Sequence, residues 1–104
     1  MYALFHDLPT EEAEHWSSQL KPQSVKAIWS TQTYEAWKDI PSTYIVCEKD
    51  RVIQPEKQEE MIANARAVQP MAFDVVERLD CGHQPILSNV QEMVEIVKRA
   101  AKTT

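Results

Sequence analysis

The sequence predicts an α/β fold in which a helical segment precedes a strand–helix–strand–helix unit. Two runs of β-branched and apolar residues, STYIVCE and AFDVVERL, are typical of strands buried in a parallel sheet. Each run is followed by a segment whose apolar residues recur at helical spacing. The change of period after Pro41 divides the chain into residues 1–40, a helical segment, and residues 41–104, an α/β unit.

The first part of the chain, residues 1–40, shows helical signals only. A first helix is expected to begin at Thr10, with acidic residues in its first turn, and to end before Pro22. PQSVKAIWS and TQTYEAW continue as two weaker helical pieces. We expect their aromatic residues to form a small core and in part to line a ligand pocket. These residues are Trp16, Trp29, Tyr34 and Trp37.

The second part contains the two expected strands and two helices. The first strand is expected at Thr43 to Cys47, and an amphipathic helix opens at Pro55. AFDVVERL is the second strand, and Ser88 begins the capping sequence of a final helix. A strand–helix–strand connection of this length is right-handed and leaves the two strands parallel.

Two residues capable of acid–base chemistry follow these strands. Asp50 lies in EKDRVIQP after the first strand, and His83 lies in DCGHQP after the second. Parallel strands end at one edge of a sheet, about 4.8 Å apart, so the two side chains can reach hydrogen-bonding distance. A carboxylate there holds an imidazole in one tautomer and stabilises its protonated form, as a general base requires. We expect Gly82, the one glycine of the chain, to let this loop turn sharply.

The residues around these two loops resemble a known family. IPSTYIVCEKDRVIQPEKQEEMI and VVERLDCGHQPILSNVQEMVEIVKRA resemble the C-terminal part of an α/β-hydrolase, of the branch with small esterases similar to plant methylesterases and hydroxynitrile lyases. HDLPTEEAEHWSSQLKPQS resembles the helical cap of such proteins. The resemblance implies that Asp50 and His83 are the acid and base of a Ser-His-Asp triad. It also implies a small ester-like substrate, bound by Trp16, Trp29, Trp37 and Cys81.

The 104 residues do not contain the Gly-x-Ser-x-Gly elbow in which such enzymes hold their serine nucleophile. We therefore expect a truncated, C-terminal segment of a hydrolase, which carries the acid and base and is inactive alone. Two strands also leave a parallel sheet incompletely covered. We expect self-association, or binding to a complementary N-terminal chain.

Three other interpretations of the same residues stay open. A non-catalytic remnant would bind a partner or a small apolar ligand beneath the cap. A thiol hydrolase would use Cys81 as the nucleophile for His83. A small zinc-binding protein would take its ligands from the same two loops, namely Cys47, Asp50, Cys81 and His83.

Composition and charge argue against several classes of partner. A net charge of −5 and scattered basic residues disfavour nucleic acid. No segment approaches the roughly 20 apolar residues of a membrane helix, and from the first residues we expect no secretory signal. With only two cysteines, we expect reduced thiols and a cytoplasmic location. No Gly-rich phosphate loop or zinc-protease motif is present, so we expect no cofactor.

Overall fold

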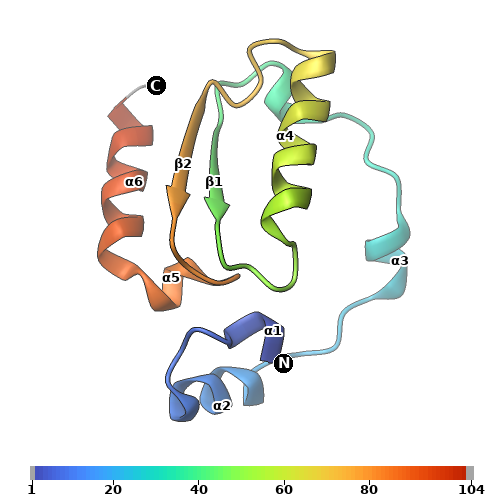
Figure 1. Cartoon of the computed structure of the whole chain (residues 1–104). Coiled ribbons are helices and arrows are strands. Elements are labelled where there is room, and N and C mark those ends of the chain that lie inside the picture. Colours follow the sequence, from blue (N-terminus) through green and yellow to red (C-terminus); the bar gives the residue numbers. More distant parts are fainter. Residues whose placement is uncertain (1, 103–104) are drawn as a thin grey trace.

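The computed structural model describes residues 2–102, which form two parallel strands and a set of helices around them. In chain order the elements are α1 (Tyr2–Phe5), α2 (Thr10–Ser18), α3 (Val25–Trp29), the 3-10 helix η1 (Ala36–Lys38), β1 (Thr43–Cys47), α4 (Pro55–Val68), β2 (Val75–Leu79), α5 (Pro85–Ser88) and α6 (Val90–Lys102). Figure 1 shows β1 and β2 side by side between α4 and α6, with α1 and α2 beyond the arrowheads of the strands. The predicted α/β fold class is confirmed.

The two strands pair in parallel and in exact register, from Thr43 opposite Val75 to Cys47 opposite Leu79. Both therefore end at the same edge of the sheet, as the sequence predicts. The predicted first strand matches β1 residue for residue, and the predicted helix at Pro55 matches the start of α4. The loops that follow β1 and β2 consequently begin side by side.

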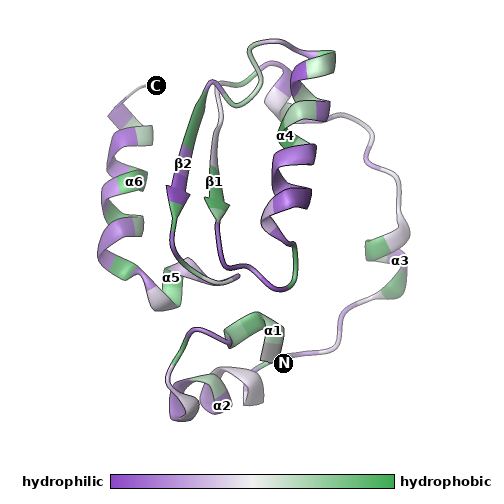
Figure 2. Cartoon of the chain, viewed as in Figure 1, coloured by the Kyte–Doolittle hydropathy of each residue, from purple (hydrophilic) through white to green (hydrophobic). Residues whose placement is uncertain are grey.

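The core lies between the sheet and α6. Cys47 and Leu79 end the two strands and pack with Cys81 and with Ile96 of α6, all nearly inaccessible to solvent. Figure 2 shows hydrophobic and hydrophilic residues alternating along α6, as expected for an amphipathic helix. Ile96 of this helix is buried, whereas Val90, Val94 and Val97 are exposed.

The N-terminal segment differs from the expected aromatic core. Helix α2 begins at Thr10 as predicted, but Trp29 of α3 is 80% exposed and Trp16 of α2 is 37% exposed. In Figure 1, α3 stands apart from the sheet on an extended connection, so its apolar side chains have no layer to pack against. The prediction of one shared aromatic core is therefore wrong.

The boundary before the last helix also differs from the expectation. The short helix α5 intervenes, and Ser88 ends it, with its hydroxyl donating to the carbonyl of Gln84 at 3.3 Å. Helix α6 starts two residues later, and the side chain of the preceding Asn89 donates to Glu92 at 2.7 Å. Ser88 is thus a C-terminal residue of α5 rather than the cap of α6. Helices α1 and α5, of four residues each, were not expected.

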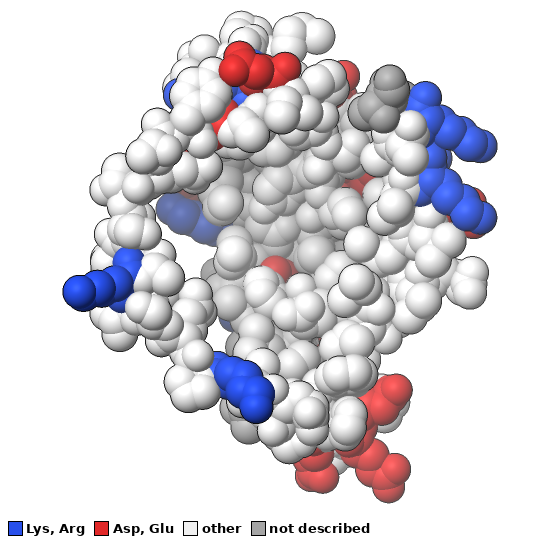
Figure 3. Space-filling view, turned by 180° about the vertical axis from the view of Figure 1, so that it is seen from behind, with Lys and Arg blue, Asp and Glu red and all other residues white. Residues whose placement is uncertain are grey.

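The molecule is open for its size. Its radius of gyration is 15.3 Å, against about 13 Å for a compact domain of this length. Its accessible surface is 7777 Å², against roughly 6000 Å² for a folded monomer of this mass. Figure 3 shows a face that is hollowed at its centre, with basic side chains in several separate groups rather than in one patch. No helix within residues 2–102 is long and apolar enough to cross a bilayer.

Candidate active site

The two loops at the carboxyl edge of the sheet bring Asp50 and His83 into contact. Nδ1 of His83 lies 2.9 Å from Oδ2 of Asp50, although 33 positions separate the two residues. Asp50 stands three residues after β1, and His83 stands four residues after β2. The contact expected from the parallel arrangement of the strands is present in the structure.

Asp50 is held in place by its own loop. It is 6% exposed, and its Oδ1 accepts hydrogen bonds from the amides of Val52 at 2.8 Å and Ile53 at 3.0 Å. Burial raises the pKa of Asp50, but the hydrogen bonds from His83 and from these two amides outweigh burial and hold that pKa below its ordinary value. The carboxylate is therefore ionised and aimed at His83.

A buried glutamine fixes the start of this acid loop. Gln58 of α4 is 2% exposed, and its side-chain amide binds both backbone groups of Cys47: Oε1 accepts from the amide at 2.9 Å and Nε2 donates to the carbonyl at 3.0 Å. Nε2 also donates to the carbonyl of Ile53 at 2.8 Å. One side chain thus joins the end of β1, the far end of the acid loop and α4. The run EKQEE has the charged composition of an exposed helix face. The interpretation of the sequence therefore did not indicate that Gln58 is buried and binds the acid loop.

Backbone hydrogen bonds join the acid loop to the base loop beyond the strands. The amide of Glu48 donates to the carbonyl of Leu79, and the amide of Lys49 donates to the carbonyl of Cys81, each at 2.9 Å. An exposed ion pair between Lys49 and Asp80, at 3.0 Å, spans the same two loops. The parallel ladder therefore continues up to the residues that flank the pair.

The protonation pattern of the pair follows from its partners. An ionised carboxylate only accepts hydrogen bonds, so Nδ1 of His83 must donate to Asp50. In the neutral imidazole, Nε2 is then the free acceptor. The His83 side chain is 25% exposed, so part of the ring is accessible to solvent while Asp50 holds Nδ1. In such an arrangement the imidazole can accept a proton from a hydroxyl, and the Asp50 carboxylate stabilises the resulting positive charge.

Gly82 serves a purpose other than the sharp turn expected of it. No glycine among the described residues has a positive φ, so the loop does not need glycine for its backbone conformation. A Cβ at Gly82 would lie 2.7 Å from Oδ1 of Asp7 and 2.8 Å from Cε1 of His6. Glycine at this position leaves room for the side chains of His6 and Asp7, from the loop between α1 and α2, to pack directly against the backbone. The polar segment around His6 suggests a solvent-facing side chain. In the structure, His6 is instead half-buried in this contact.

The two cysteines belong to the core. Cys81 is 1% exposed and packs with Cys47, so the structure does not place it on the wall of an open pocket. Burial, followed by the neighbouring Cys47, raises the pKa of the Cys81 thiol from 9.0 to about 12, which disfavours a nucleophilic thiolate. Within residues 2–102 no group of three or more histidine, cysteine or acidic side chains is placed to hold a metal ion. The zinc-site interpretation is therefore wrong for this arrangement of the loops.

The three tryptophans expected at the substrate are dispersed. Trp16 stacks edge-on against His15 at 4.9 Å, and Trp29 projects into solvent. Trp37 packs against Phe73, which lies two residues before β2 and therefore at the amino edge of the sheet, opposite His83. A substrate role for these residues stays a prediction, and the structure does not bring them together.

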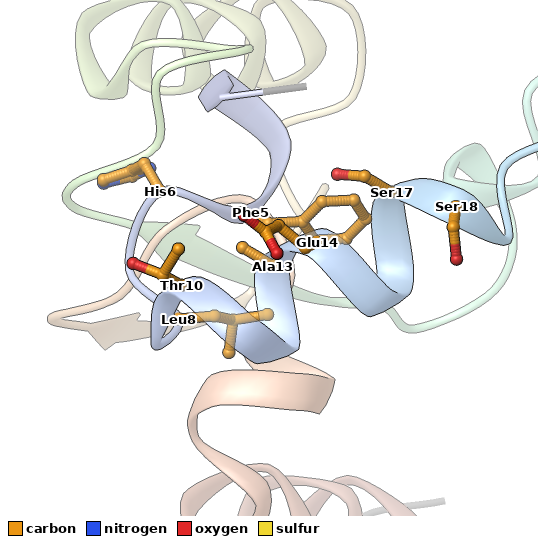
Figure 4. A pocket seen from close by; sticks show the side chains of 8 residues that line it. All are labelled: Phe5, His6, Leu8, Thr10, Ala13, Glu14, Ser17 and Ser18. Atoms are coloured by element: carbon orange, nitrogen blue, oxygen red, sulfur yellow. The ribbon is translucent and has the colours of Figure 1, made fainter.

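An open pocket of about 480 Å³ lies between α1 and α2 instead. Figure 4 shows Phe5 and Ala13 at its centre and His6 on the loop at its edge. Its wall combines apolar and polar side chains, namely Phe5, His6, Leu8, Thr10, Ala13, Glu14, Ser17 and Ser18. His6 and the following Asp7 connect this pocket to the loop of His83.

Comparison with known proteins identifies the family of the chain. Residues 1–98 match the profile of the alpha/beta hydrolase family. The chain belongs to the alpha/beta hydrolase family. Among curated proteins, the chain is 34% identical over 98 residues to "Alpha/beta hydrolase nvfD" of Aspergillus novofumigatus, and 31% identical over 99 residues to "Probable hydrolase R7" of a Phoma species.

The matches cover the two partners unequally. They span 94% and 95% of this alpha/beta hydrolase chain but 37% and 40% of the two relatives. The chain therefore spans about two fifths of the length of the curated proteins that it matches. No solved structure matches it significantly.

Proposed function

We propose that Asp50 and His83 are the acid and the general base of a Ser-His-Asp hydrolase that acts on a small ester or related acyl substrate. The contact of 2.9 Å between Oδ2 of Asp50 and Nδ1 of His83 carries this proposal. It leaves Nε2 free to act on a nucleophile, which is the role of the base in such a triad.

The proposed reaction uses His83 as a proton carrier. Nε2 takes the proton of a serine hydroxyl as the serine oxygen bonds to the acyl carbon, and it then gives that proton to the departing alcohol oxygen. A water molecule repeats the sequence and releases the acid. Asp50 stabilises the imidazolium formed in each half of the reaction because its carboxylate is already ionised and oriented.

The proposed nucleophile comes from residues other than these 104, which lack a Gly-x-Ser-x-Gly elbow. We propose that a complementary N-terminal chain or segment docks on this unit and that residues 1–104 alone do not turn over substrate. The excess accessible surface and the exposed apolar residues of α6 support docking, since both are unusual for an isolated monomer. Phe5, Leu8 and Ala13, which line the pocket between α1 and α2, support a partly apolar substrate.

A segment exchange tests the proposal. Residues 1–98 replace the matched segment of the Aspergillus novofumigatus relative, and the hybrid protein is treated with a fluorophosphonate, which reacts with activated serines. We expect labelling of a serine outside the exchanged segment, a loss of about 10³-fold or more in labelling rate for His83→Ala, and little change for the matched control His15→Ala.

The thermal melt of each hybrid separates folding from chemistry. A His83→Ala hybrid that melts like its parent and is labelled at the same rate would contradict the proposal. That result would favour the non-catalytic role, in which the unit binds a partner or a small apolar ligand.

A further inference from the structure

A carboxylate far away in the sequence binds the backbone beside the base. Asp7 lies in the loop between α1 and α2, and its Oδ2 accepts a hydrogen bond from the amide of Gly82 at 2.7 Å. The two residues are 75 positions apart, and Gly82 directly precedes His83. A short bond from an amide to a carboxylate belongs to the stronger class of hydrogen bonds.

The choice of glycine at position 82 fits the close approach of the Asp7 carboxylate. An added Cβ at Gly82 would meet Oδ1 and Cγ of Asp7 at 2.7 and 2.9 Å, closer than side chains approach one another in folded proteins. The chain thus places its one glycine where Asp7 comes against the backbone. Any other residue at position 82 would push the loop and the Asp7 side chain apart.

The buried carboxylate of Asp7 would be energetically unfavourable if this residue only filled space. Oδ1 of Asp7 is buried and has no hydrogen-bond partner within the described part of the chain. Burying a carboxylate oxygen in this way costs free energy, which a neutral or apolar side chain would avoid. The bond to Gly82 therefore accounts for an acidic residue here better than packing does.

We propose that Asp7 is a positioning residue for the base: its carboxylate fixes the backbone of the Gly82–His83 loop so that the imidazole stays in line with Asp50. This inference rests on the proposed function of His83. Asp50 fixes the ring through Nδ1, whereas Asp7 fixes the main chain that carries the ring. The N-terminal helices thereby take part in the geometry of a base that lies near the other end of the chain.

Hydrogen exchange in the 104-residue chain tests the inference, with NMR detection of three protons. These are the Gly82 amide, the Nδ1 proton of His83, and the Lys49 amide, which binds the Cys81 carbonyl and reports on the intact junction of the loops. In Asp7→Ala we expect the first two to exchange about tenfold faster or more, while the Lys49 amide keeps its rate. Asp7→Asn retains an acceptor oxygen of the same shape, so we expect it to restore both rates.

Several results would overturn the inference. Unchanged rates in Asp7→Ala would do so, as would equal acceleration of all three protons, or failure of Asp7→Asn to restore protection. The matched control is Asp74→Ala, which removes an exposed carboxylate just before β2, away from both loops, and should leave all three rates unchanged. Asp50→Asn separates this inference from the proposed function: if it leaves the His83 proton unaffected the proposed pair fails, whatever Asp7 does.

Discussion

Oδ2 of Asp50 lies 2.9 Å from Nδ1 of His83 at the end of two loops that parallel strands carry to one edge of the sheet. Gln58 holds the acid loop on both sides of Asp50, through Cys47 and Ile53. Asp7 holds the base loop at Gly82, directly before His83. The 104 residues therefore contain both the acid–base pair and the side chains that hold it. This arrangement and the packing around it lead to five predictions.

Acid should weaken the contribution of Asp50 to stability. Because the pKa of Asp50 is lowered in the folded chain, its contribution is fully present above the unfolded value of about 4 and is lost as pH falls through the folded pKa. Near neutral pH, Asp50→Asn should lower the free energy of unfolding by about 1.5–3 kcal/mol, since it weakens hydrogen bonds to a charged group. Urea melts at pH 7 and pH 3 should show this difference shrinking in acid; a difference independent of pH would contradict the assignment.

Replacing Gln58 should destabilise the chain more than its place in a charged run suggests. Gln58→Ala leaves the amide and carbonyl of Cys47 and the carbonyl of Ile53 without their buried partner. We expect a loss of about 2–3 kcal/mol in the free energy of unfolding. Denaturant melts should show almost no loss for Asn64→Ala, an exposed position of the same helix. Equal losses for both variants would refute the proposed role of Gln58.

The thiols should be inert in the folded chain. Burial raises the pKa of both cysteines, that of Cys81 to about 12, so reaction with iodoacetamide at pH 8 should be about 100-fold slower or more than in denaturant. Ser30→Cys places a thiol at an exposed position and should react at once in the native chain. Rapid reaction of Cys81 with iodoacetamide in the folded chain would instead support the thiol-hydrolase interpretation.

The raised pKa of Cys81 also predicts a loss of stability in alkali. The raised pKa of Cys81 gives a contribution that is complete below its unfolded value of 9.0 and is lost as pH rises toward about 12. Melting temperatures measured from pH 8 to pH 11 should fall less steeply for Cys81→Ala than for the parent chain. Parallel curves for the two proteins would count against the buried thiol.

An alanine at Gly82 should be harmful because of Asp7 rather than because of the backbone. The added Cβ meets the Asp7 carboxylate, and we expect Gly82→Ala to cost about 1–3 kcal/mol in the free energy of unfolding. The cost should fall by about 0.5 kcal/mol or more in an Asp7→Ala background, which removes the carboxylate while His6 remains. Strictly additive losses in this double-mutant cycle would mean that Asp7 is not the group that requires glycine.

The sequence predicts the contact between Asp50 and His83 well because local patterns determine it. The strand Thr43–Cys47 stands between Pro41 and a charged turn, and the parallel pairing that follows from its connection to β2 brings Asp50 to His83. These steps need only strand period, connection length and the geometry of parallel strands. The same patterns do not reveal what lies outside the two loops.

Asp7 and Gln58 were missed because their roles depend on tertiary packing. Gln58 carried a usable signal, since it shares the helical face of the buried Ile62 and Ala65 and is uncharged in a charged run. Gly82 also carried a usable signal, because a lone glycine before a histidine indicates the close approach of another group to the backbone as readily as a turn. Nothing in the sequence indicates that α3 lies apart from the sheet and leaves Trp29 exposed, because its apolar residues suit a buried helix equally well.

The tautomer of His83 tests the central claim most directly. In ¹⁵N NMR spectra of the 104-residue chain with neutral imidazole, we expect a proton on Nδ1 of His83 and an unprotonated Nε2, and a mixture of tautomers in Asp50→Asn. An exposed histidine, His15, serves as the internal reference. A proton on Nε2 in the parent chain, or a tautomer that does not respond to Asp50→Asn, would contradict the acid–base pair.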